Sequence, residues 1–396
     1  MISDQLKDTL VDQIVKELIG KGTDGIGPVL ELIFNAAMKI ERERFLRAGS
    51  HERTEERKGY ANGYKPKSFQ TRLGALELAI PQVRGLGFYP ESLEKGSRSE
   101  KALKVAIAQM YLEGVSTRRV QDITEKLCGY EVSSTQVSRV TQELDGHFEQ
   151  FRTRQIGEIC YLVLDAIYLK VRHNGTVIDM AILLAYGVNS EGKREILGAS
   201  ASLSEAEVHW REFLKSLQSR GMRGLRLVVS DDHAGLKSAR KSVFPSVPWQ
   251  RCQFHLCQNA QSYAPKKSMR SEITDVMRDI FNSPTLEMAQ EMKLRAIEKY
   301  RNRAPEFARW LEDNIDEGLT VYKFPREHWK KIRTSNGIER VNREIKRRTR
   351  VAVLFPNKES ALRLVTGVIM EVHEEWATGK QYLNMDPLLK GTAKNE

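Results

Sequence analysis

Residues 159–188 read ICYLVLDAIYLKVRHNGTVIDMAILLAYGV, and this stretch decides the fold of the chain. Two apolar runs flank Asn174-Gly175, a dipeptide typical of the two-residue turn that joins antiparallel strands. Asp165 follows four consecutive apolar residues of the first run. A carboxylate within a strand is costly unless it is paired or binds a cation. The stretch therefore predicts a β-hairpin with a functional acid, the alternative being a strand-end aspartate in solvent.

The residues after this hairpin predict an α/β domain. Further strands are expected at 195–201 and 225–230, and helices at 206–217 and 234–243. Three meandering strands, a helix, a strand and a helix follow the order of a ribonuclease-H-like fold, whose first and fourth strands are neighbours. That adjacency would bring Asp165 to Asp231, which ends the fourth strand 231 − 165 = 66 positions later.

A third acid, Glu339, lies in a basic segment with a helical pattern. Residues 323–350 contain eleven Lys or Arg against three Glu, a density that suits contacts with phosphates. Lys346 follows Glu339 by seven positions, which puts both on nearly the same helix face. The DNA-contacting residues predicted here are Arg340, Arg343, Lys346, Arg347 and Arg348. The alternative for Glu339 is a capping-box role, because Asn336 precedes it by three residues.

Asp231 is followed by a second aspartate, Asp232, and either one could cap the helix that begins near His233. We assign Asp231 to a metal, because it adjoins the strand, and Asp232 to capping. Together Asp165, Asp231 and Glu339 offer the carboxylate oxygens that could hold two Mg²⁺ ions about 3.5–4 Å apart.

Cys252 and His255 have a spacing that suggests zinc, and Cys257 is close by. A structural zinc site usually has four ligands in two separated pairs, and a second pair is missing here. A packed Cys252 and a hydrogen-bonding His255, both structural and near the active site, are predicted instead.

Composition and periodicity divide the chain into six regions. They are 1–56, helical; 57–98, with a small β-hairpin; 99–157, helix-turn-helix-like; 158–265, the first part of the ribonuclease-H-like core; 266–325, an all-helical insertion; and 326–396, which completes the core with the Glu339 helix and C-terminal helices. The first region carries a stripe of Leu6, Leu10, Ile14 and Leu18, which is either a dimerisation seam or an ordinary core face.

The helix-turn-helix prediction rests on short helices with capping residues. Ser116 or Thr117 can cap one helix, and Ser133 or Ser134 can cap the next. Such a motif places its last helix in the major groove of DNA. The DNA-contacting residues predicted in this region are Arg118, Arg119, Gln136 and Arg139. A small helical bundle or linker is the alternative.

The bulk composition favours a polyanionic partner. The 396 residues carry a net charge of +11, and four cysteines in so long a chain do not form a disulfide framework. The first residues lack the pattern of a signal peptide, and the longest apolar stretch, 180–188, is far shorter than the ~20 residues of a membrane helix. We therefore expect a soluble intracellular protein without a membrane partner. Walker, G-x-S-x-G and G-x-G-x-x-G patterns do not occur.

Three long motifs resemble those of the Mutator-type transposases of bacterial insertion sequences. The segment 231–255 fits the family signature that begins with a catalytic aspartate, 161–172 resembles the first-aspartate motif, and 336–346 resembles the glutamate motif with its trailing basic residue. Residues 71–78 and 88–90 are similar to its N-terminal region, so the resemblance spans roughly 57–357. Asp232 departs from the pattern, since relatives more often carry a small residue there.

The resemblance implies a DDE transposase with Asp165, Asp231 and Glu339 as its catalytic metal ligands. It would bind the terminal inverted repeats of its element in double-stranded DNA, use two Mg²⁺ ions (or Mn²⁺), free a 3′-hydroxyl and join it to a phosphodiester, through a circular intermediate. It would act as a homodimer on DNA in the bacterial cytoplasm, at the nucleoid. Two other classes stay open: a ribonuclease-H-like nuclease or resolvase, and a non-catalytic helix-turn-helix regulator.

Overall fold

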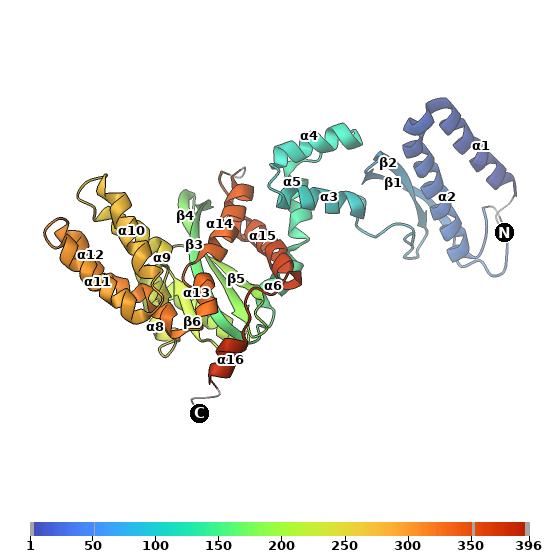
Figure 1. The fold of residues 1–396 in the computed structure, drawn as a ribbon. Coiled ribbons are helices and arrows are strands. Elements are labelled where there is room, and N and C mark those ends of the chain that lie inside the picture. Colours follow the sequence, from blue (N-terminus) through green and yellow to red (C-terminus); the bar gives the residue numbers. More distant parts are fainter. Residues whose placement is uncertain (1–3, 51, 351–352, 393–396) are drawn as a thin grey trace. The chain divides into compact units, whose positions relative to one another are not determined.

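The chain divides into two compact units, Met1–Glu143 and Leu144–Glu396, each with its own hydrophobic cores. The computed structural model describes residues 4–50, 52–350 and 353–392 (Figure 1). Mixed α/β structure is confirmed, with one two-stranded and one five-stranded sheet in these residues.

The first unit begins with helices packed on a hairpin. Its elements are α1 (Asp4–Lys21), η1 (Gly22–Gly25), α2 (Ile26–Leu46), β1 (Ala61–Thr71) and β2 (Gly74–Val83). Met38 of α2 is buried together with Leu76, Leu78 and Ile80 of β2. The strands pair antiparallel up to Thr71 and Gly74, as the sequence predicts, and Gly74 takes a φ of +117° that other residues rarely adopt.

No described side chain of the predicted apolar stripe on α1 is fully buried. Leu10 and Ile14 are half-buried and Leu18 is 40% exposed, while the side chain of Leu6 lies outside the described residues. The core-face alternative is therefore not supported for these residues.

Three helices complete the first unit: α3 (Lys101–Leu112), α4 (Thr117–Cys128) and α5 (Ser134–Gln142). They surround a core that includes Ile107, Val120 and Val137. Ser116 and Ser133 cap α4 and α5 as predicted, and Gly129 closes α4 with a left-handed backbone. The chain thus forms two short helices joined by a tight turn, as a helix-turn-helix requires.

The residues of this motif that were predicted to contact DNA differ in the contacts they make within the chain. Arg118, Arg119 and Arg139 are exposed. The side chain of Gln136 instead completes the capping box of α5, where its Oε1 accepts from the Ser133 N–H at 2.8 Å, and its Nε2 lies 3.4 Å from Gln70. Gln136 is therefore engaged in holding the fold rather than free to contact a base.

The second unit is built on a five-stranded sheet. Its strands are β3 (Ile159–His173), β4 (Thr176–Asn189), β5 (Arg194–Ser202), β6 (Leu227–Ser230) and β7 (Trp249–Arg251), in the order β5-β4-β3-β6-β7. The turn between β3 and β4 is at Asn174 and Gly175, both with positive φ, as predicted. The predicted adjacency of the first and fourth strands is also confirmed, because β3 pairs in parallel with β6. The three-residue β7 was not predicted, since so short a strand shows no periodicity.

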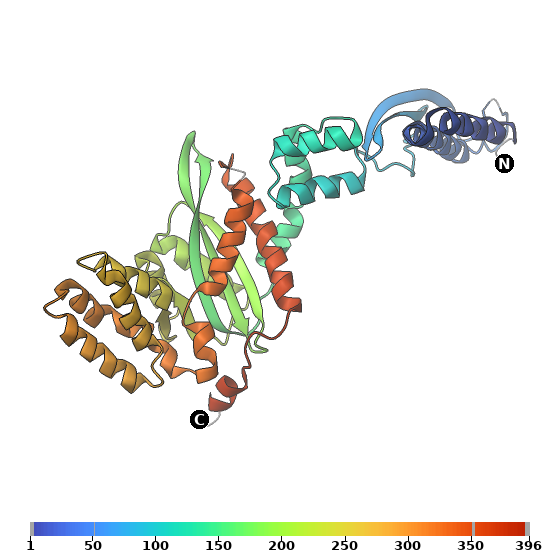
Figure 2. The same ribbon diagram turned by 45° about the horizontal axis from the view of Figure 1, so that its top comes forward.

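Helices cover both faces of this sheet. Leu162 and Leu164 of β3 face α7 (Glu207–Ser219) and α8 (Ala234–Val243) in a hydrophobic core of the unit. The alternate residues of β3 point to the other face. That face is covered by α13 (Arg326–Ile332), α14 (Asn336–Thr349) and α15 (Lys358–Thr378), the last two of which pack side by side (Figure 2). The helix α16 (Asp386–Thr392) follows.

The region 99–157, predicted to be helix-turn-helix-like, contains one further helix after α5. Residues 145–153 form a separate α6 (Asp145–Thr153), which belongs to the second unit. Arg363 of α15 pairs with Asp145 at 2.7 Å, which fixes α6 against α15. Although residues 99–157 were grouped by sequence, the part from 144 onward packs with the sheet.

The predicted helical insertion contains α10 (Met269–Phe281), α11 (Leu286–Tyr300), α12 (Pro305–Asn314), η2 (Ile315–Gly318) and η3 (Thr320–Lys323). The preceding α9 (Gln253–Ser262) shares its core through Leu256 and Ala260. By packing, the helical layer therefore begins at α9, earlier than the predicted residue 266. Among the described residues, no helix has the length and apolar character to cross a membrane.

Candidate active site

Asp165 lies in the middle of the sheet, on the face covered by α14. Its Oδ1 accepts a hydrogen bond from the Ala166 N–H at 2.9 Å, and its Oδ2 accepts one from Asn342 Nδ2 at 2.6 Å. The second contact ties β3 to α14, the helix that carries Glu339. The Oδ1 of Asn342 is buried and has no hydrogen-bond partner among the described residues.

Asp231 follows β6 at the position that matches Asp165 on β3. Val163 pairs with Val229, and each aspartate lies two residues further along. The Asp231 carboxylate accepts a bond from the His233 N–H at 3.3 Å. The sheet thus brings together the two acids that the sequence separates.

Asp232 does not cap α8, which corrects the role predicted for it. His233 is the N-cap residue and forms no side-chain cap. The carboxylate of Asp232 instead pairs with Lys237 at 3.0 Å and with Arg251 at 2.9 Å, and Glu317 of η2 pairs with the same two cations. Asp232 therefore belongs to an ion-pair network that links the sheet to the helical layer.

Glu339 lies in the first turns of α14, whose N-cap is Ser335. The capping box with Asn336, which was the alternative role for Glu339, is absent, because this helix end carries no side-chain cap. Ser335 Oγ lies 3.4 Å from Glu339 Oε1 and 3.2 Å from Cys252 Sγ, and the Ser335 N–H also donates to that sulfur at 3.3 Å. The glutamate is therefore held beside the start of α9.

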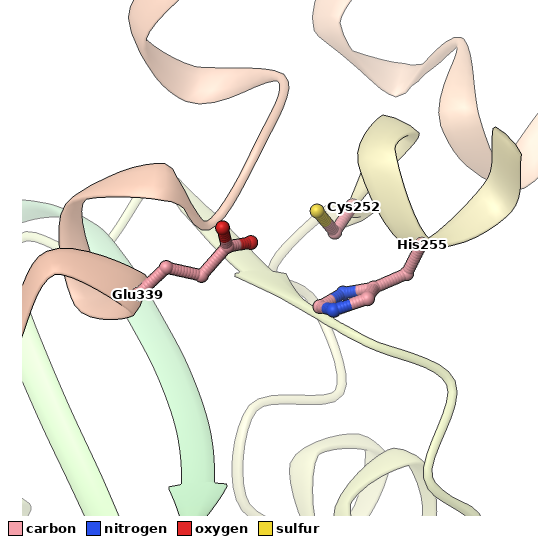
Figure 3. A group of neighbouring side chains, drawn as sticks. All are labelled: Cys252, His255 and Glu339. Atoms are coloured by element: carbon pink, nitrogen blue, oxygen red, sulfur yellow. The ribbon is translucent and has the colours of Figure 1, made fainter. Parts of the chain in front are cut away.

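Cys252 and His255 complete this group. The ligand atoms of Cys252, His255 and Glu339 lie within 4.8 Å of one another, and Figure 3 shows the Glu339 carboxylate directed from α14 toward the thiol at the start of α9. Cys252 is fully buried, as predicted, and Nδ1 of His255 is buried without a hydrogen-bond partner in the described part of the chain.

The charges of Asp165, Asp231, Cys252 and His255 affect one another's pKa values. Burial raises the pKa of Asp165 to about 6, and the negative charge of Asp231 adds to this effect. The pKa of His255 is raised to about 9 by the Cys252 thiolate and, further, by Asp165 and Asp231. Burial opposes ionisation of Cys252, but His255 and Ser335 together bring its pKa below the ordinary value. The charges of Asp165 and Asp231 therefore act on His255, whose ligand atom lies within 4.8 Å of that of Glu339.

The basic residues predicted on α14 fall into two groups. Arg343 and Lys346 are exposed, and no described residue forms an ion pair with either. Arg340 is exposed and pairs with Glu375 at 2.8 Å, and Arg347 pairs with Glu344 at 2.7 Å. Arg348 is buried between Glu344 and Glu371. The charge of Arg348 thus stabilises the packing of α14 on α15, and its predicted contact with DNA is not tested by this structure.

Comparison with known proteins identifies the family. A model of the Mutator family of transposases matches residues 1–379. The chain belongs to the Mutator family of transposases. Among family members, the transposase for insertion sequence element IS406 of Burkholderia multivorans is 50% identical over 93% of this chain and 96% of its own length. The transposase for ISRM5 of Rhizobium meliloti is 39% identical over 94% of each chain, and that for IS256 in transposon Tn4001 of Staphylococcus aureus is 35% identical over 96% of each.

Two residues of the site in this Mutator-family chain were not predicted by sequence. Asn342 contacts Asp165, and Ser335 contacts both Cys252 and Glu339. The signal for Asn342 was its spacing, because it follows Glu339 by three residues and so shares its helix face. The role of Ser335 depends on α9 lying against α14, which no local pattern reveals.

Replacing Asp165 by Asn should stabilise the metal-free chain at neutral pH. The pKa of Asp165 rises from an ordinary 3.8 to about 6, so its ionised form is less favourable in the folded chain by about 3 kcal/mol at most. The folded state then binds more protons than the unfolded state between these values, and wild-type stability falls as pH rises through them. The gain from D165N should be complete above pH ~6 and absent below pH ~4. Denaturant unfolding with a chelator measures it.

Asp232→Asn is the matched control at the neighbouring loop. It removes a carboxylate that pairs with buried Arg251, so it should lower the free energy of unfolding at pH 7. This change is opposite in sign to the one expected for D165N. Equal unfolding free energies for wild type and D165N at neutral pH would mean that ionisation of Asp165 does not destabilise the folded chain.

Proposed function

We propose that this chain is a DDE transposase that cuts the ends of an insertion sequence and joins the freed 3′-hydroxyl groups to DNA. The observation that carries the proposal is the matching position of Asp165 and Asp231 beside neighbouring parallel strands, next to the helix that carries Glu339, in a chain of the Mutator family. The sheet order β5-β4-β3-β6-β7 with helices on both faces supports a ribonuclease-H-like core.

The residues present fit a pair of divalent cations such as Mg²⁺, or Mn²⁺ in its place. Two carboxylates lie close enough for one to raise the pKa of the other, which is unfavourable until a cation offsets their charge. The unpartnered Oδ1 of Asn342 adds a buried oxygen beside them. Asp165, Asp231 and Glu339 would hold the ions, since Mg²⁺ prefers oxygen ligands.

When bound, such ions supply Lewis-acid activation of the attacking oxygen and stabilisation of the leaving oxygen. In this proposal β3 and β6 hold the two aspartates at matching positions, and α14, the helix that carries Glu339, contacts Asp165 through Asn342. Asn342 orients Asp165 by donating to its Oδ2. Arg343 and Lys346, exposed on α14, would hold the phosphates of the DNA near these acids.

Recognition of the element ends is assigned to the first unit, where α4 and α5 expose Arg118, Arg119 and Arg139. Joining two ends requires two sets of acids, so we propose a homodimer on DNA. The exposed apolar side chains of α1, Val11, Val15 and Leu18, offer a surface for that contact. A circular intermediate of the element is the proposed route.

The test uses the full-length chain, labelled element ends and a second, unlabelled DNA. With Mg²⁺ we expect a nick at the element end and a new product in which the labelled 3′ end is joined to the second DNA. Chelation should abolish both products. Nicking without any joining would instead favour a ribonuclease-H-like nuclease or resolvase, and end binding without Mg²⁺-dependent products would favour a regulator.

A further inference from the structure

The residues Cys252, His255 and Glu339 place three different kinds of metal ligand at one point. Sulfur and imidazole come from the start of α9, and a carboxylate comes from α14 (Figure 3). We infer that they form a binding site for a thiophilic divalent cation such as Zn²⁺, separate from the oxygen-ligated ions of the proposed reaction. The sequence shows only the first two ligands, and the third comes from a residue 84 positions beyond His255 (339 − 255).

The ligand set selects the kind of cation. A soft thiolate with an imidazole and one carboxylate suits zinc, whereas Mg²⁺ favours oxygens alone. Zinc at about 2.0–2.3 Å from each ligand would hold these atoms roughly 3.3–3.8 Å apart in a tetrahedron. The three ligand atoms already lie within 4.8 Å of one another. Side-chain rotations that move each atom by about 1 Å would therefore close the site. The fourth position stays open, as in zinc sites that keep an exchangeable ligand.

The surroundings hold the ligands in place before a cation arrives. Cys252 is fully buried at the N-cap of α9, and its sulfur accepts from both the N–H and the Oγ–H of Ser335. Hydrogen bonds to sulfur favour the thiolate, which is the form that binds metals. The buried Nδ1 of His255 has no hydrogen-bond partner among the described residues and so retains an unused coordinating atom.

Glu339 is shared between this site and the proposed catalytic acids. A thiophilic cation bound to Cys252 would draw the Glu339 carboxylate away from Asp165 and Asp231. Zinc should therefore inhibit strand cleavage and joining, a consequence that rests on the proposed function. Binding of the cation itself does not depend on that function and can be measured without DNA.

The test of binding uses Co²⁺ as a coloured probe on the full-length, chelator-treated chain. We expect a thiolate-to-Co²⁺ charge-transfer band in the near ultraviolet that saturates at one equivalent and disappears when Zn²⁺ is added. Cys252→Ser should remove the band. Cys257→Ser is the matched control, because Cys257 lies on the same helix outside the cluster, and it should keep the band.

Two further variants keep the test decisive if Cys252→Ser fails to fold, which circular dichroism reports. Glu339→Gln should weaken Co²⁺ binding at least ~10-fold, since even partners outside the ligand shell are worth 10–100-fold. Asp165→Asn should leave it within about twofold, because Asp165 is not a ligand here. No band in wild type, or a band that persists in Cys252→Ser and is lost in Cys257→Ser, overturns the site.

The test of inhibition adds equimolar Zn²⁺ to the Mg²⁺ reaction. The wild-type rate should fall at least tenfold, while Cys252→Ser should resist zinc relative to its own rate. A Co²⁺ band without zinc inhibition would overturn the competition for Glu339 and leave the metal site standing. A Co²⁺ band in a chain that never nicks DNA would overturn the proposed function alone.

Discussion

Asp165→Asn, Asp231→Asn and Glu339→Gln should each reduce cleavage and joining of element ends by at least ~1,000-fold. A lost carboxylate removes a ligand of ions that are worth several kcal/mol in the transition state, and each 1.36 kcal/mol is tenfold in rate. Binding of the ends should change by less than about threefold, because the acids hold cations rather than bases. Denaturing gels measure the products, and mobility shifts measure the binding.

Asp232→Asn serves as the control for position and charge. Asp232 lies next to Asp231 and loses the same charge, but its carboxylate pairs with Lys237 and Arg251. We expect a stability loss of about 1 kcal/mol, because Glu317 still pairs with both cations, and less than a tenfold loss of activity. Full activity in any of the three catalytic variants would remove that residue from the active site, and an inactive D232N with an active D231N would exchange the two aspartates.

Replacing Arg118, Arg119 and Arg139 together by Ala should weaken binding to element ends by at least about 1,000-fold. All three are exposed on α4 and α5, and a hydrogen bond to a charged group is worth ~1.5–3 kcal/mol. The slope of log K against log salt should fall by about 2.7 if each contacts a phosphate. Fluorescence anisotropy over a salt series measures both quantities.

The control for this variant also removes three positive charges from the first unit, but outside α4 and α5. Lys16, Lys21 and Arg44 are exposed on α1 and α2, outside the helix-turn-helix. Their replacement by Ala should lower affinity only through the weaker overall field, by less than about tenfold. Equal losses in both triple variants would mean that α4 and α5 do not contact the DNA.

Local patterns in the sequence were sufficient for the first four strands of the five-stranded sheet. Asn174-Gly175 fixed the register of the long hairpin, because a two-residue turn with positive φ values allows one pairing of β3 with β4. The adjacency of β3 and β6 followed from the order of strands and helices. Capping by Ser116 and Ser133 was likewise predictable, since it involves only residues three positions apart.

Only the tertiary structure decided the partners of the polar side chains. Asp232 was predicted to cap a helix but pairs with Arg251 and Lys237, and Arg348 was predicted to contact DNA but is buried against Glu371. An exposed Lys or Arg and a buried, paired one look the same in the local sequence of a helix. Which of the two forms depends on where a distant carboxylate comes to lie.

The group of Cys252, His255 and Glu339 shows the same division. The sequence determined that Cys252 and His255 lie one helical turn apart and that Glu339 begins a basic helix. Their meeting depends on α9 and α14 packing against one another through Ser335, over 83 positions of chain (335 − 252). Periodicity specifies which face of a helix is buried. The element that covers this face is selected by the free energy of packing the whole core, which depends on residues from distant segments.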